Sequence, residues 1–179
     1  MKFAKLLCII VTLAIMLSAC TLDLKQLIGF EDSDKAANDT CRQIIEAIQK
    51  QDAVALKSLF AAAVQDDIDT LEQDIDTLFN FIQGDITFFS QAGILPEYTK
   101  NYGERTTIIK ASFLIETNTN TYCMAIKECA EDTVNAQNVG IISIYIINAV
   151  VWNSDYVYYG GGEWKQGIHI KTTAHIRED

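Results

Sequence analysis

The hydrophobic pattern of this chain changes its period at Gly84. Before Gly84, apolar residues recur every three or four positions, and after it apolar and polar residues alternate. The first period is typical of amphipathic helices and the second of half-buried strands. Helices followed by antiparallel strands predict an α+β fold in which the N-terminal helices pack on one face of a sheet.

Three helices are expected before Gly84. Ser33 or Asp34 is expected to cap the first, because short polar side chains accept hydrogen bonds from the N–H groups of a first turn. Asp52 should cap a short second helix, and Asp67 a third that closes at Gly84 in a left-handed conformation. The apolar stripes are Ala37, Cys41, Ile44, Ile45 and Ile48, then Leu56, Leu59 and Phe60, then Ile68, Leu71, Ile75, Leu78, Phe79 and Ile82.

Strands are expected after Gly84, and the only proline, Pro96, is expected in the connection after the first of them. The run at residues 140–152 is almost entirely apolar and β-branched, which is typical of a central strand. One predicted strand alternates clearly, with Ile109, Ala111, Phe113 and Ile115 on one face. The predicted strands are residues 85–90, 106–116, 121–129 and 140–152, with residues 165–176 as a candidate last strand.

The first twenty residues have the organisation of an export signal. Lys2 and Lys5 provide a positively charged start, and residues 6–17 are apolar except for Thr12. This stretch is shorter than the roughly 20 residues that a transmembrane helix needs. The Leu-Ser-Ala-Cys sequence at residues 17–20 resembles the lipobox of bacterial lipoproteins, in which the cysteine receives diacylglycerol. We expect residues 1–19 to be cleaved and Cys20 to be lipidated. An ordinary cleaved signal is the alternative.

The mature chain is strongly acidic. Cleavage removes Lys2 and Lys5 from 14 basic residues, so 12 remain against 24 acidic residues and the net charge changes from −10 to −12. Phosphate backbones and anionic head groups repel such a chain, so nucleic acid is not an expected partner. The two acyl chains on Cys20 are expected to hold the protein on the cell membrane, facing away from the cytoplasm. Residues 20–32 are then a short tether and residues 33–179 a single domain.

A first helix followed by a short one, opened by Asp52 and carrying Leu56, Leu59 and Phe60, resembles the start of nuclear transport factor 2-like domains. More closely, residues 33–148 resemble a family of small Gram-positive lipoproteins of unknown function with this cone-shaped fold. The matching segments are the Ile44/Ile48 helix and residues 52–60, 81–84 and 142–148. The resemblance implies helices packed on a curved antiparallel sheet. The fold usually has a strand or hairpin between its second and third helices, whereas only residues 61–66 are available here.

Three cysteines remain after Cys8 leaves with the signal and Cys20 is lipidated. Cys123 and Cys129 fall on one face of a predicted strand but about 20 Å apart, which is too far for a disulfide. We expect Cys41, Cys123 and Cys129 to be buried, inert thiols. A disulfide from one of the strand cysteines to Cys41 is the alternative.

Candidate ligand contacts gather near the C-terminal end, beside the glycines at residues 160–162. Aromatic rings there are suited to stacking on sugars or lining the mouth of a pocket, although aromatics are also common in strands for packing alone. The candidates are Trp152, Tyr156, Tyr158, Tyr159 and Trp164. His169 and His175 lie nearby without the further ligands that a metal site requires, so both are expected to be ordinary strand residues.

Acidic residues crowd the predicted third helix. An EF-hand loop needs a glycine at its sixth position, which is missing here, so we interpret this cluster as a solvated face rather than a calcium or cationic-ligand site. Its members are Asp66, Asp67, Asp69, Glu72, Asp74 and Asp76.

The sequence contains no HExxH motif, nucleophile elbow or phosphate-binding glycine loop. Chemistry of the ketosteroid isomerase type needs a carboxylate base opposite a tyrosine, for which Asp85 or Glu116 with Tyr145 are the candidates. We expect a non-catalytic domain, without metal or cofactor, that binds a small ligand or an envelope protein. A cone-pocket isomerase, dehydratase or hydrolase is the alternative.

Overall fold

A computed structural model describes residues 29–151 and 163–171 of the chain. The predicted signal peptide, Cys20 and nearly all of the tether lie outside these residues. The chain divides into two compact units, residues 1–35 and 36–179, and a helix over residues 29–50 runs from the first into the second. Within the described residues, no helix combines the length and the apolar character needed to cross a membrane.

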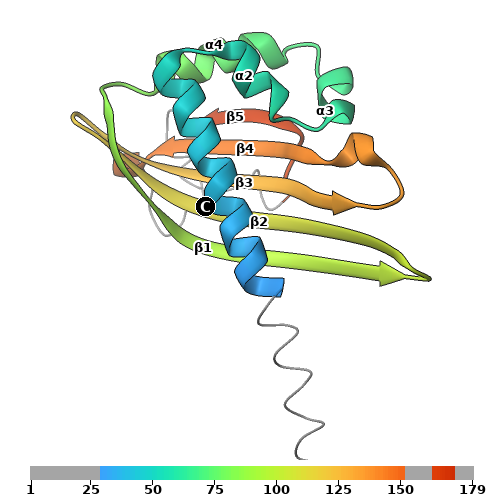
Figure 1. Cartoon of the computed structure of the whole chain (residues 1–179). Coiled ribbons are helices and arrows are strands. Elements are labelled where there is room, and N and C mark those ends of the chain that lie inside the picture. Colours follow the sequence, from blue (N-terminus) through green and yellow to red (C-terminus); the bar gives the residue numbers. More distant parts are fainter. Residues whose placement is uncertain (1–28, 152–162, 172–179) are drawn as a thin grey trace, which may run out of the picture. The chain divides into compact units, whose positions relative to one another are not determined.

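The second unit has the predicted α+β architecture, with helices first and a five-stranded sheet after them (Figure 1). The strands follow one another across the sheet in chain order, and the first four are antiparallel neighbours. The elements are α2 (Ala53–Ser58), α3 (Ala62–Asp67), α4 (Leu71–Phe81), β1 (Ile86–Asn101), β2 (Glu104–Thr117), β3 (Thr121–Asp132), η1 (Ala136–Asn138), β4 (Gly140–Asn148), η2 (Ala149–Val151) and β5 (Gly167–Lys171).

The last strand corrects the prediction of a wholly antiparallel sheet, because β5 is parallel to β4. A parallel neighbour requires a connection that runs back along the sheet, and residues 149–166 provide the necessary length. The described part of the predicted last strand is also shorter than expected, since β5 ends at Lys171 and residues 172–179 lie outside the described residues.

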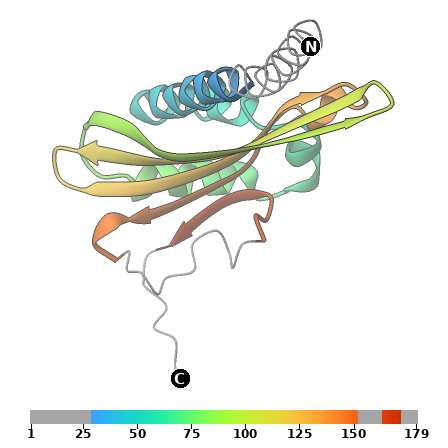
Figure 2. The ribbon, with the colours of Figure 1, turned by 90° about the horizontal axis from the view of Figure 1, so that it is seen from below.

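Residues 36–50 lie across the strands on one side of the sheet (Figures 1 and 2). The predicted helical stripes and the alternating residues of β2 meet there in one apolar core. Ile109, Ala111, Phe113 and Ile115 are all buried in it, as the alternation predicted. The core continues across β3 and β4 through Tyr122, Met124, Ile126, Ile141, Ile144 and Ile146.

One of the three predicted helix caps is confirmed, and the other two are wrong. Asp52 Oδ1 accepts a hydrogen bond from Ala55 N at 2.9 Å and caps α2 as expected. Ser33 and Asp34 instead lie inside the first helix, which already includes Gly29. Ser33 Oγ donates a hydrogen bond to the Gly29 carbonyl at 2.9 Å, one turn earlier in the same helix.

The predicted third helix is two helices. Asp67 is the last residue of α3 rather than a cap, and α4 begins at Leu71. The break occurs at Ile68, whose backbone is extended, with φ −110° and ψ 93°. Gly84 has the predicted left-handed conformation after α4, with φ +84°.

Strand β1 is much longer than predicted and includes Pro96, which pairs with Ile109 instead of lying in a connection. An edge strand tolerates proline because half of its N–H groups have no neighbouring strand. Tyr102 and Gly103 connect β1 to β2 with φ 45° and 95°, as in a type I′ hairpin turn.

The segment between α2 and α4 stands where the fold resemblance implies a strand or hairpin. Phe60 forms one isolated parallel bridge with Ile141, and α3 follows directly. The two backbones approach so closely that a Cβ at Gly140 would lie 2.7 Å from Ala61 N and 2.9 Å from the Leu59 carbonyl oxygen. Gly140, with φ +128°, is therefore the residue that permits this contact.

Candidate functional site

The sheet has two different faces. Successive residues of a strand point to opposite faces, so the residues between those of the core form the far face, turned away from the helices. Cross-strand pairing arranges them in rows, two of which concern the site. The first row is Gly93, Ser112, Ala125, Tyr145 and His169, and the second is Leu95, Lys110, Lys127, Ser143 and Gly167.

A hollow of about 300 Å³ lies over β1 and β2 on this face. Its residues are Gly93, Ile94, Leu95, Lys110, Ala111, Ser112 and Trp164. Gly93 and Ser112 pair directly, and a Cβ at Gly93 would lie only 3.2 Å from Ser112 Oγ. The hollow therefore exists because two neighbouring strands have small residues at the same register position.

Trp164 reaches the hollow from the connection before β5, far from β1 and β2 in sequence. Its carbonyl oxygen accepts a hydrogen bond from Ser143 Oγ at 3.3 Å. Its ring makes an edge contact with the ring of Tyr145, with centroids 5.8 Å apart and an interplanar angle of 81°. Tyr145 Oη in turn accepts a hydrogen bond from Lys165 N at 2.9 Å. These contacts fix Trp164 on β4 while it borders a hollow over β1 and β2.

The hollow combines apolar and charged chemistry. Leu95 and the Trp164 ring offer apolar surface, and Ser112 offers a hydroxyl. Lys110 Nζ lies 2.7 Å from Glu97 Oε1, and the Lys110 side chain is only 22% exposed. This arrangement suits a small molecule with an apolar body and a polar end.

Only one of the five predicted aromatic contacts lies within the described residues, and that one, Trp164, does border a hollow. The other four, Trp152, Tyr156, Tyr158 and Tyr159, lie outside them. Gly93, Lys110 and Ser112 were not among the residues predicted to form a site. Gly93 was missed because β1 was predicted to end at residue 90, so that no partner for Ser112 was expected.

Comparison with known protein families places residues 43–149 in a family described as a domain of unknown function (DUF5104). The match covers more than half of the chain. The chain belongs to the DUF5104 family. A search of curated proteins found no match to it. The DUF5104 match includes both strands beneath the hollow but not Trp164, so the residue that completes the hollow lies beyond the matched region.

The three cysteines of the DUF5104 chain that are described are buried thiols, as predicted. Cys41 lies in the core on the helix side, and burial raises its pKa to about 12. Cys123 belongs to a small separate cluster with Ile147 on the far face, where burial raises its pKa to about 11. The alternative disulfide from Cys123 or Cys129 to Cys41 is not formed, since all three thiols are free.

The other candidate residues of the DUF5104 domain do not form a site together. Of the acidic cluster, all but the half-buried Asp74 are exposed, and Glu72 pairs with Lys57 at 2.7 Å. Among the described residues, no group of three or more His, Cys, Asp or Glu side chains is arranged to hold a metal. His169 stacks on Tyr145 with centroids 4.4 Å apart, and His175 lies outside the described residues.

The proposed pairing of Asp85 or Glu116 with Tyr145 is not present. Asp85 lies in the exposed connection before β1. Glu116 lies near the end of β2, whereas Tyr145 lies in mid-strand two strands away, in register with Ser112. Four residues along a strand correspond to about 13 Å, so neither carboxylate lies opposite the Tyr145 hydroxyl.

A different carboxylate, Glu128 of β3, is buried on the helix side. It pairs between Ile109 and Ile141, and its Oε2 accepts a hydrogen bond from Thr40 Oγ1 at 2.6 Å. Its Oε1 has no hydrogen-bond partner among the described residues. Burial raises the pKa of Glu128, and the Thr40 hydrogen bond opposes this only in part. No periodicity signals such a residue, because a single acid in an otherwise apolar strand also fits an exposed position.

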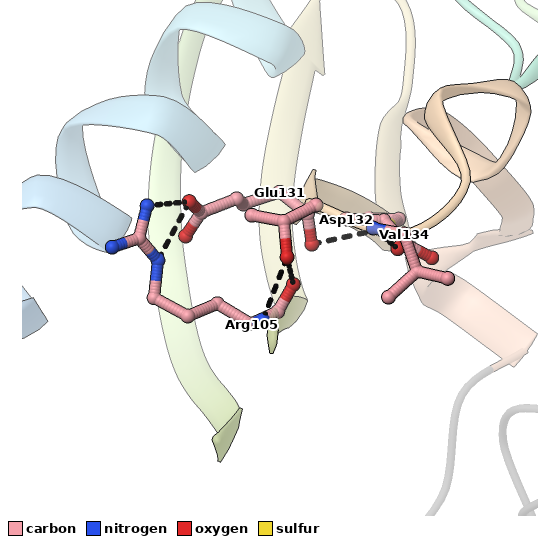
Figure 3. A network of polar contacts seen from close by, with 6 residues as sticks. Arg105, Glu131, Asp132 and Val134 are labelled. Carbon is pink, nitrogen blue, oxygen red and sulfur yellow. Dashed lines mark hydrogen bonds and ion pairs between the residues drawn. The ribbon is translucent and has the colours of Figure 1, made fainter. Parts of the chain in front are cut away.

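A network of polar contacts joins β2, the end of β3 and the β3–β4 connection (Figure 3). Arg105 Nη2 lies 2.6 Å from Glu131 Oε1, and Arg105 Nε donates to the same oxygen at 3.0 Å. Asp132 Oδ1 accepts from the backbone N–H of Val134, and its Oδ2 accepts from Asn138 Nδ2 at 2.8 Å. The Asn138 hydrogen bond, with smaller contributions from the backbone, lowers the pKa of Asp132. These acids hold the β3–β4 connection rather than forming a binding site.

Proposed function

We propose that this DUF5104 protein is a membrane-anchored extracytoplasmic lipoprotein whose domain binds a small ligand in the far-face hollow without converting it. The hollow of about 300 Å³ over Gly93 and Ser112, bordered by Trp164, is the observation that carries the proposal. Its volume is at the lower end of the range for small-molecule sites, which usually combine apolar walls with a few polar groups.

The lipid anchor is supported by the order of charged, apolar and lipobox residues up to Cys20. Diacylglycerol supplies the two acyl chains that stable attachment requires. The strongly negative charge of the chain supports a lipid rather than a basic surface as the means of attachment.

The fold is, on this proposal, a variant of the nuclear transport factor 2-like cone. The short α2 opened by Asp52 and the helices on one side of the sheet support it. In this variant the single Phe60–Ile141 bridge and α3 replace the usual strand between the second and third helices. The helix side is then filled by apolar side chains, and the ligand is left to the far face.

Replacing the lipidated cysteine tests the anchor. We expect Cys20→Ala to move the protein from the membrane fraction of its host to the soluble extracytoplasmic fraction, because the acyl chains supply the attachment. Fractionation and mass spectrometry of the N-terminal peptide measure both location and lipid. Membrane retention of the variant at the wild-type level would contradict the proposal.

Filling the hollow tests the binding site. Native mass spectrometry of residues 21–179, purified from the host envelope, is expected to show a retained ligand that Ser112→Leu loses. Leucine at this position would occupy the space beside Gly93 and Trp164. Ser90→Leu, on the same face but outside the hollow, is the matched control and should keep the ligand. An unchanged retained mass in Ser112→Leu would place the ligand elsewhere.

A further inference from the structure

Two lysines lie side by side on the far face. Lys110 of β2 pairs directly with Lys127 of β3, and their row continues to Leu95 on one side and Ser143 on the other. Directly opposed residues of antiparallel strands have Cβ atoms about 5 Å apart, so the two ammonium groups can reach the same point. Lys110 borders the hollow, and Ser143 holds the Trp164 carbonyl. Lys127 therefore lies between Lys110, which borders the hollow, and Ser143, which holds the connection that carries Trp164.

Like charges directly opposite one another in a sheet are destabilising. Here one carboxylate compensates for two cations, since Glu97 pairs with Lys110 at 2.7 Å. The side chain of Lys127, which is half-buried, has no ion pair or hydrogen bond among the described residues. Glu163 and Lys165, in the connection that carries Trp164, pair with one another at 3.3 Å and add no net charge. The hollow thus lies beside one uncompensated positive charge in a chain whose net charge is −10.

We propose that the ligand of the hollow is a small organic anion. Its carboxylate or phosphate group binds between Lys110 and Lys127, where it relieves their repulsion. Its apolar or ring-shaped body lies against Trp164 and Leu95 and over the small residues Gly93 and Ser112. This inference rests on the proposed function, which requires the hollow to bind a ligand of any class.

The chemistry of each side chain suits the part of the ligand that it would contact. Lysine ammonium groups are compact charges that bind carboxylate or phosphate without demanding one geometry. An indole ring edge-packed on Tyr145 presents a large, rigid apolar surface at little entropic cost. The Ser112 hydroxyl also borders the hollow and can donate a hydrogen bond to an oxygen of the anion.

A matched set of probes tests the inference: 2-naphthoate, 2-naphthyl phosphate and the neutral amide 2-naphthamide, titrated by calorimetry into residues 21–179. We expect both anions to bind at least five-fold more tightly than the amide. Lys127→Met should remove most of that preference and leave amide binding unchanged. Lys50→Met, which removes a lysine paired with Glu46 on the first helix, is the matched control and should keep the preference. Whichever anion binds more tightly identifies the group as carboxylate or phosphate.

The outcomes separate this inference from the function on which it rests. Equal binding of amide and anions, lost in Ser112→Leu, would retain the binding site and overturn the anionic ligand. An anion preference that survives Lys127→Met would also overturn it. Failure of all three probes to bind at millimolar concentration would overturn both this inference and the proposed function of the hollow.

Discussion

The two faces of the sheet are built from the same strands but differ in what their side chains do. On the helix side, β2 contributes Ile109 and Phe113, both at most 1% exposed and packed against helices. On the far side, the intervening residues Lys110 and Ser112 border a hollow. Large apolar residues in register fill space, whereas small residues in register leave it empty.

On our proposal, the helix side provides the stability of the domain and the far side binds the ligand. The helix side contains one exception, Glu128, whose cost the surrounding core must offset. The far side also contains an exception, the opposed pair Lys110 and Lys127. A bound anion would relieve the repulsion between these two charges. Each exception gives a way to test the division.

The largest effect is expected from Phe113→Ala. Removing a fully buried phenyl ring leaves a cavity among packed helices and should lower the free energy of unfolding by about 3–5 kcal/mol. Its neighbour Leu114 points to the far face and is half-buried, so Leu114→Ala should cost less than half as much. Urea unfolding of both variants measures the ratio, and equal costs would mean that the far face carries as much stability as the helix side.

An intermediate, pH-dependent effect is expected from Glu128→Gln. Because burial raises the pKa of Glu128, the folded protein keeps a proton that the unfolded chain releases above the ordinary value of 4.5. Stability from this group is therefore complete below pH 4.5 and is lost as pH rises through the folded pKa.

Urea midpoints from pH 4 to 8 measure this dependence. Glu128→Gln should match the wild type at the acid end and be more stable at pH 8 by about 1–3 kcal/mol, because at that pH the carboxylate buries a charge and the amide does not. Glu131→Gln, at an exposed ion pair, is the control and should show no such pH-dependent gain. Parallel pH profiles for the wild type and Glu128→Gln would show that Glu128 is solvated.

The smallest effect is expected from Tyr145→Phe on the far face. It removes the acceptor for Lys165 N and should cost about 1 kcal/mol of stability. The variant should also bind naphthoate a few-fold more weakly, because the connection carrying Trp164 loses a contact to β4. Tyr122→Phe, whose hydroxyl bonds Gln83 N on the helix side, should instead affect stability and leave probe binding unchanged. If Tyr122→Phe weakened probe binding and Tyr145→Phe did not, the probe would bind on the helix side.

Local chemistry made much of this fold predictable from the sequence. Asp52 caps α2 because its side chain meets an N–H three residues away, a contact that needs no tertiary partner. The alternation from Ile109 to Ile115 indicated the buried face of β2 because strand geometry alone sets that period. Errors arose where a distant segment decides the structure. Pro96 lies within β1 because β1 has a neighbour on one side only, and Ile68 divides the predicted third helix.

Sequence alone determined the order of helices and strands, the core residues and an acidic composition unsuited to nucleic acid, because these depend on period and charge. The tertiary structure decided which small residues share a register position, that Trp164 and Lys110 border one hollow, and that Lys127 pairs with Lys110 beside it. Those relations join β1, β2, β3 and the connection before β5. Contacts between segments so far apart follow from strand pairing, and no local pattern encodes which strands will pair.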